Sequence, residues 1–197
     1  MLEREWLVCP THNYLVIQKC GNSYIRDICH QVYGDKFHLA RECNYRNLKW
    51  TVVRDPKDRF ISGLAYDIWK NNYSNFDTIF SNLNKLVQYP ISSTFYNQGK
   101  VKHTILQSAY LIYQPIDVFV DIADLTEFTL HNFNITSETY NYVPGEFKVK
   151  VKEEIVSRGL EQRVDDILAN DVYLYKQIIN SDRLWCWQNG NVVGHLK

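Results

Sequence analysis

The stretch that decides the fold is YLVIQKCGNSY, residues 14–24. Its apolar first half predicts a buried strand over 14–18. The helix that should follow has Ile25, Ile28, Cys29 and Val32 on one face, because residues three and four apart share a side of a helix. Gly34 is a suitable helix end. A strand that runs through a glycine-bearing loop into a helix is the unit from which α/β proteins are built.

A second unit of the same kind begins at residue 49. The run WTVV, residues 50–53, predicts a strand over 49–53, and RDPKDRFIS, residues 54–62, follows it directly. Asp55-Pro56 suits a helix start, where proline is tolerated. The residues Ile61, Leu64, Ala65 and Ile68 then mark one apolar helix face.

The rest of the chain continues the alternation with weaker signals. The remaining predicted elements are a strand near 36–40, a helix at 76–87, a mixed segment at 98–113, a strand at 117–122, a helix at 125–133 capped by Asp124, an irregular segment at 134–150, a mostly helical segment at 151–180 and a hairpin within 184–196. Together they predict an α/β protein with a P-loop-like three-layer fold, in which helices flank a central parallel sheet. One domain over 1–197 accommodates all of them.

Composition and charge narrow the class of protein. Of the 197 residues, 22 are Lys or Arg and 22 are Asp or Glu, which argues against a general affinity for nucleic acid or acidic membranes. No apolar run approaches a membrane span, and the N-terminal residues do not resemble a signal peptide, so we expect a soluble, cytoplasmic protein. The five cysteines are odd in number and include no CxxC pair, which favours reduced thiols and no metal site.

The first loop carries the groups that bind a phosphate. A helix start offers unpaired backbone amides and a partial positive charge. Gly21 lets the backbone approach a ligand, Lys19 adds a cation, and Asn22 or Ser23 can cap the helix or add hydrogen bonds. The common nucleotide-triphosphatase pattern, G-x-x-x-x-G-K-[ST], is absent because here the lysine precedes the glycine.

The second loop offers a second anion site. Arg54 leaves its strand with a rigid fork of donors that suits a phosphate, and Ser62 follows eight positions later. Arg59 is expected to pair with Asp55 or to pack against the sheet. Two loops of this kind predict a ligand with phosphates at two ends.

Both loops together resemble the sulfotransferases that use 3′-phosphoadenosine 5′-phosphosulfate (PAPS), most closely the carbohydrate (Golgi-type) branch in a compact, soluble form. The resemblance implies that the first loop binds the 5′-phosphosulfate and that Arg54 and Ser62 bind the 3′-phosphate. Looser similarities are His103-x-x-x-Gln107 and the stretch NDVYLY at 170–175. The first-loop residues that match the family are Lys19, Cys20, Gly21, Asn22, Ser23 and Tyr24.

The same resemblance implies a reaction. Lys19 would stabilise charge on the oxygen that bridges phosphate and sulfuryl group, and adenosine 3′,5′-bisphosphate (PAP) would be the product. The base would be His38 or Glu42, with His38 preferred because an imidazole has the better intrinsic pKa at neutral pH. The expected acceptor is a hydroxyl of a carbohydrate or small molecule, with no metal, nucleic acid or membrane involved. The sequence does not indicate an oligomeric state.

The sequence is also compatible with two other functions. A P-loop kinase would use the strand VFVD, residues 118–121, to place Asp121 as a magnesium ligand. A non-catalytic protein of the same fold would bind PAP and transfer nothing.

Overall fold

The computed structural model describes residues 5–70, 104–138, 144–188 and 191–193. The predicted helix at 76–87 and His103 lie outside this range. Over the described residues the strands are β1 (Trp6–Val8), β2 (His12–Leu15), β3 (His38–Ala40), β4 (Leu48–Val53), β5 (Val118–Asp121), β6 (Leu184–Gln188) and β7 (Asn191–Val193). The helices are α1 (Asn22–Tyr33), α2 (Pro56–Lys70), α5 (Gln107–Leu111), α6 (Leu125–Phe133), α7 (Gly145–Ser157) and α8 (Glu161–Ile179), with short 3₁₀ helices η1 (Gly34–Lys36) and η3 (Ile122–Asp124).

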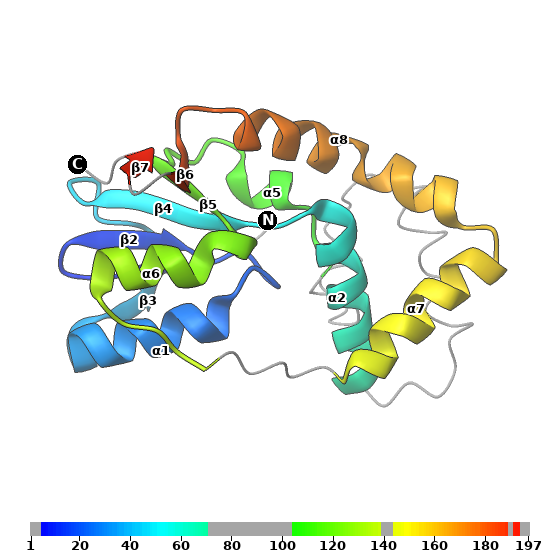
Figure 1. The fold of residues 1–197 in the computed structure, drawn as a ribbon, viewed down its shortest axis with the longest axis horizontal. Helices are drawn as coiled ribbons and strands as arrows, with labels where there is room; N and C mark the ends of the chain where they lie inside the picture. Colours follow the sequence, from blue (N-terminus) through cyan, green and yellow to red (C-terminus); the bar gives the residue numbers. More distant parts are fainter. Residues whose placement is uncertain (1–4, 71–103, 139–143, 189–190, 194–197) are drawn as a thin grey trace.

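The strands form one mixed sheet in the order β3-β1-β2-β4-β5-β6-β7 (Figure 1). The central strands β2, β4, β5 and β6 pair parallel, as the alternation of strands and helices predicts. The prediction of a parallel sheet is wrong at one edge, where β1 pairs antiparallel with β2 and β3, whereas the hairpin predicted within 184–196 is confirmed by the antiparallel pairing of β7 with β6. Connection length explains two of these pairs, β1 with β2 and β6 with β7, since strands joined by a few residues fold back antiparallel.

Helices cover both faces of this sheet. Successive residues of a strand point to opposite sides. On β4, Trp50 packs on Phe128 of α6, with ring centroids 4.8 Å apart, and Val53 faces Leu111 of α5 and Leu174 of α8. The fold is therefore α/β, with a sheet flanked by helices.

The helices beyond the sheet have a core of their own. At the right of Figure 1, α2 packs against α7 and α8. Their shared cluster consists of Phe60, Ile61, Leu64, Ala65, Ile68, Val151, Ile155, Val164 and Leu168. The positions predicted as the apolar face of α2 all belong to it. This packing holds α2 beside the sheet, and with it the residues of the second loop that form the first turns of the helix.

Helix ends follow local rules in part. Helix α2 begins at Pro56, where the Oδ1 atom of Asp55 accepts a hydrogen bond of 2.9 Å from the Asp58 amide, and α1 ends at Gly34 with φ +55°. The prediction that Asn22 or Ser23 caps α1 is wrong, because Gly21 is the N-cap. Helix α6 has the predicted bounds, but the Asp124 side chain makes no capping bond.

Two further predictions differ from the structure. Residues 145–150, expected to be irregular, form the first turns of α7. Strand β1 was not expected, because three residues are too short to show a period. None of the described helices is both long and apolar enough to cross a membrane.

Candidate functional site

The two loops lie at the same edge of the sheet. Strands β2 and β4 are parallel neighbours, and each leads into its loop at its carboxyl end. Helix α1 begins at Asn22 and α2 at Pro56, so both helices direct their first turns to this edge (Figure 1). In open α/β sheets, ligands bind at the carboxyl ends of the strands.

A hydrogen bond joins the two loops directly. The Nη1 atom of Arg54 donates to the carbonyl oxygen of Lys19 at 3.2 Å. The same guanidinium holds the Asp58 carboxylate, with Nε 2.7 Å from Oδ2 and Nη2 bound to the same oxygen. An anion that entered between the loops would therefore compete with Asp58 for Arg54.

Lys19 is set in an unusual environment. Its φ of +65° is rare outside glycine, and its Nζ atom lies 3.4 Å from the centroid of the Tyr66 ring. Burial, opposed by the charge of Asp67 and aided by that of Arg54, lowers the pKa of the Lys19 ammonium to about 8. A bound anion would restore the charge that burial disfavours. The aromatic partner Tyr66, on α2, was not among the predicted site residues.

Gly21 is required by both backbone and packing. Its φ is +77°, and a Cβ added there would lie 2.7 Å from Cδ2 of Leu125 on α6. Among its neighbours, Asn22 uses Oδ1 to accept a 2.7 Å hydrogen bond from the Tyr14 hydroxyl, and Ser23 is exposed. The start of α1 thus presents its backbone, with the Asn22 side chain already bound.

The side chains of Cys20 and Tyr24, which were also predicted to touch the ligand, are buried. Burial raises the pKa of the Cys20 thiol to about 12, and its Sγ donates to Oε1 of Gln107 at 3.6 Å. The Tyr24 hydroxyl makes a buried 2.7 Å hydrogen bond with Oγ1 of Thr129. Their side chains lie in the core, so only their backbone can face a ligand.

Ser62 lies deeper than expected. It is 5% exposed and stands one helical turn after Asp58 along α2. Residues four apart share a helix face, so Ser62 continues the face that carries Asp58. Ligand access to its hydroxyl therefore needs movement of the side chains around it.

The two candidate bases lie at different places. In the sheet, His38 of β3 lies opposite Val8 of β1, and Val8 lies opposite Asn13 near the start of β2. The Lys19 loop follows the other end of β2. The structure does not bring His38 to the loops. Glu42 is exposed and lies between Ala40, which is level with the end of β2, and Asn44, whose amide donates to the Asn13 side chain at the start of β2, so no contact joins Glu42 to either loop among the described residues.

A buried ion pair supports the loops from behind, and sequence reasoning missed it. Arg59 and Asp171 are fully buried, with Nη2 3.8 Å from Oδ2. Arg59 also donates from Nη1 to the Gln18 carbonyl at 3.3 Å, so it fixes the strand end that precedes Lys19. The predicted pairing of Arg59 with Asp55 is wrong: the Asp55 carboxylate instead caps α2.

Gln107 connects this pair to the second loop. Its Nε2 donates to the Arg54 carbonyl at 2.7 Å, and its Oε1 accepts from the Arg54 amide at 3.1 Å. The Asp171 carboxylate accepts from the amides of Gln107 and Ser108 at 2.6 and 2.9 Å. The loose similarity noted at His103-x-x-x-Gln107 and at 170–175 was the only sequence signal for these residues.

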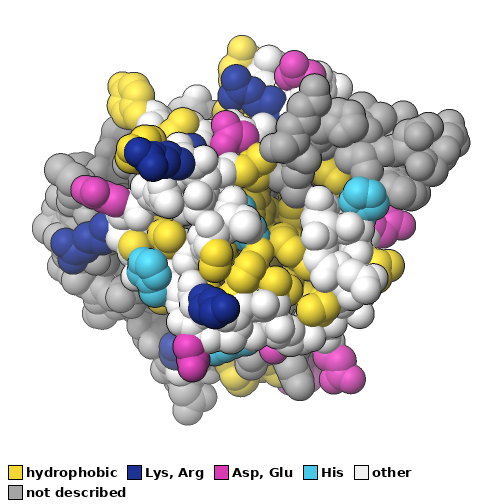
Figure 2. All heavy atoms as spheres, turned by 90° about the vertical axis from the view of Figure 1, so that its left-hand side faces the viewer, with side chains coloured by type: hydrophobic (Ala, Val, Ile, Leu, Met, Phe, Trp, Pro, Cys, Tyr) yellow, Lys and Arg dark blue, Asp and Glu magenta, His cyan; other side chains and the backbone are white. Residues whose placement is uncertain are grey.

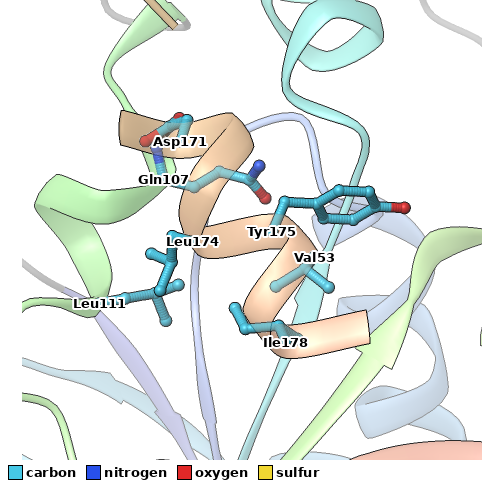
Figure 3. Close-up of a pocket in the computed structure, with 7 residues that line it drawn as sticks. All are labelled: Val53, Gln107, Leu111, Asp171, Leu174, Tyr175 and Ile178. Carbon is cyan, nitrogen blue, oxygen red and sulfur yellow. Dashed lines mark hydrogen bonds between the residues drawn. The ribbon is translucent and has the colours of Figure 1, made fainter. Parts of the chain in front are cut away.

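Figure 3 shows the space between β4, α5 and α8. It is lined by Val53, Gln107, Leu111, Asp171, Leu174, Tyr175 and Ile178, and it is too narrow to admit a water molecule. The Gln107 and Asp171 side chains lie together at one end, and Tyr175 directs its hydroxyl away from the others. This space is a packing gap behind the second loop, with no room for a ligand.

The carboxylates of Asp121 and Asp124 lie at the end of β5, the strand next to β4 in the sheet. The Tyr175 hydroxyl donates to Oδ2 of Asp121, and both burial and this bond raise the pKa of Tyr175. Burial, aided by the charge of Asp121, also raises the pKa of Asp124. Within the described ranges, no three His, Cys, Asp or Glu residues are grouped so as to hold a metal ion.

The opposite end of the sheet has a different character. Figure 2 views the left-hand side of Figure 1, where apolar side chains gather near the middle and Lys and Arg side chains are scattered. On that face the described residues form no basic cluster of the kind that a phosphate would need.

Comparisons with known proteins add no relative. No protein-family model matches the chain, and the searches of curated proteins and of solved structures found no match either. The function must therefore be argued from the geometry and from the two loops.

Proposed function

We propose that the chain is a PAPS-dependent sulfotransferase with a P-loop-like three-layer fold. The observation that carries the proposal is the hydrogen bond from Arg54 to the Lys19 carbonyl, since it sets the two predicted phosphate loops side by side at one sheet edge. The resemblance of their residues to the sulfotransferase loops supplies the identity of the ligand.

The donor would be held at both ends. The backbone amides at 21–24 and the Lys19 ammonium would bind the 5′-phosphosulfate. Arg54 would bind the 3′-phosphate after exchanging Asp58 for it, and Ser62 would assist. Anchoring the remote phosphate orients the sulfuryl group for attack, so binding energy far from the reacting bond serves the transfer.

The transfer itself needs little more. The acceptor oxygen attacks sulfur, the bond between sulfur and the bridging oxygen breaks, and PAP leaves with the bonding electron pair. Lys19 would stabilise the negative charge that develops on the bridging oxygen. The acceptor proton passes to a base, and a hydroxyl of a carbohydrate or small molecule remains the proposed acceptor.

Substitution of the two candidate bases tells them apart. His38, preferred on intrinsic pKa, lies level with the start of β2, away from the loops, so we propose Glu42 as the base. With PAPS and an accepted substrate, Glu42→Gln should lower kcat by about 10²-fold or more, the usual contribution of a general base, and His38→Gln should leave it nearly unchanged. The reverse result would return the role to His38.

Titration calorimetry with PAP tests the donor site. The wild type should bind with micromolar affinity, about −8 kcal/mol, and bind ATP much more weakly. Arg54→Ala should abolish PAP binding. Arg158→Ala is the matched control, because Arg158 also pairs four residues away, with its Nε 2.7 Å from Oε2 of Glu154, yet stands at the C-terminal end of α7.

The position of Asp121 is also compatible with one alternative function, a P-loop kinase. Asp121 ends β5, beside β4 and at the same edge as the loops, which is where a kinase places a magnesium ligand. Tight binding of Mg-ATP in place of PAP would favour the kinase. PAP binding without transfer to any acceptor in a broad screen would favour a non-catalytic binding protein.

A further inference from the structure

Two buried thiols face each other at the end of the sheet opposite the loops. The sulfur atoms of Cys9 and Cys29 are 3.7 Å apart, and each residue is 2% exposed. Cys9 directly follows β1, and Cys29 lies on α1, so the pair connects the turn between β1 and β2 to the helix that packs over it. Both are free thiols in this structure.

We propose that Cys9 and Cys29 form a redox-modification site that closes to a reversible disulfide when a hydroperoxide oxidises it. A disulfide needs a sulfur separation of about 2.05 Å, so the two atoms must approach by roughly 1.7 Å. Side-chain rotation supplies movement of this size, and the sulfurs are already in contact. Cys20, whose Sγ instead bonds Gln107, has no such partner in the contacts of the described chain.

The surroundings distinguish the two sulfurs. The hydrogen bond with Cys29, with further help from His12 and the charge of His38, lowers the pKa of the Cys9 thiol, while burial opposes this shift. The same bond raises the pKa of Cys29, which keeps its proton. Cys9 is therefore the thiolate that attacks an oxidant, and Cys29 is the thiol that resolves it.

The chemistry balances in two steps. The Cys9 thiolate attacks one oxygen of hydrogen peroxide, the O–O bond breaks, and the departing hydroxide takes up a proton to become water, which leaves Cys9 as a sulfenic acid. The Cys29 sulfur then attacks the Cys9 sulfur, and the S–O bond breaks. The second water carries the proton of Cys29. Two thiols lose two electrons, and one peroxide becomes two waters.

The position of the pair fits this role, since both thiols are buried but the turn beside Cys9 is exposed. Cys9 directly precedes Pro10 and Thr11, which are exposed, in the turn at the left of Figure 1. The turn lies at the other end of β2 from Lys19. The modification is therefore independent of the donor site and of the proposed transferase activity.

Peptide mapping tests the proposal on the full-length protein. The folded protein is treated with one equivalent of hydrogen peroxide at neutral pH, then denatured in N-ethylmaleimide and digested without reductant. We expect one dominant linked peptide that joins Cys9 to Cys29, while Cys20, Cys43 and Cys186 carry maleimide. Dithiothreitol should restore both thiols.

Two variants separate this role from general thiol oxidation. In Cys29→Ser, Cys9 should stop at the sulfenic acid and be captured by dimedone, whereas Cys43→Ser should still give the wild-type link. The proposal is overturned if Cys9 and Cys29 stay labelled while other thiols oxidise, if either pairs mainly with another cysteine, or if wild-type Cys9 reaches sulfinic acid without a link.

Discussion

The buried pair of Arg59 and Asp171 is expected to carry much of the stability of the loop edge. Asp171→Asn keeps the size of the side chain and removes its charge, which leaves the Arg59 guanidinium buried without a counter-ion; it also replaces one of the two oxygens that accept from the Gln107 and Ser108 amides with a donor. Both side chains are fully buried. Breaking a pair of this kind costs about 3–5 kcal/mol, because the remaining charge is neither solvated nor paired.

Equilibrium unfolding in urea measures this cost. With a slope of about 2 kcal/mol per molar urea, the midpoint should fall by about 1.5–2.5 M at unchanged slope. The matched control is Asp165→Asn on the same helix: its partner is Lys57, at 2.9 Å, but both side chains are about half exposed. An exposed pair contributes about 0–1 kcal/mol, so the control should hardly move the midpoint.

Comparing Asp171→Asn with Asp165→Asn shows whether burial determines how much an ion pair contributes to the free energy of unfolding. If Asp171→Asn costs no more than Asp165→Asn, Arg59 finds another partner or water, and its role as the support of the first loop is refuted. A large cost with unchanged PAP affinity at low urea would show that the pair stabilises the fold without tuning the site.

Three further predictions concern the loops. Asp58→Asn frees the Arg54 guanidinium and should tighten PAP binding by up to about fivefold, the value of a weak exposed pair, whereas weaker binding in calorimetry would contradict this competition. Because the pKa of Lys19 is about 8 and only its protonated form attracts a phosphate, raising the pH from 7 to 9 should weaken PAP binding by about tenfold, and Lys19→Arg, which stays charged, should flatten that dependence. Gly21→Ala, with φ +77° and a close contact, should cost about 2–3 kcal/mol in urea unfolding, against about 1–2 kcal/mol for Gly159→Ala, where φ is +62° and the space is open; equal costs would remove the packing argument.

Local sequence was enough for several elements. The spacing of apolar residues along α1 and α2 reports which side of each helix is buried, and Pro56 and Gly34 mark ends because their backbones are restricted or permissive. The bounds of α6 were also predicted without error. These features depend on residues within one or two turns of each other.

The nearness of the two loops was also predictable. Loops that follow parallel strands meet at one edge, and β2 and β4 are adjacent. The function assigned to this edge remains a proposal, and it rests on the residues of the two loops.

Tertiary structure alone decided the surroundings of the site. In sequence His38 stands between the loops, but β1 inserts between β3 and β2, and the register then leaves His38 at the far end of the sheet. Asp171 meets Arg59, and Cys9 meets Cys29, because burial and strand order bring together segments that are remote in the chain. The sequence determined the local periods and turns; the packing chose the partners, since long-range contacts leave no periodic trace in the segments that make them.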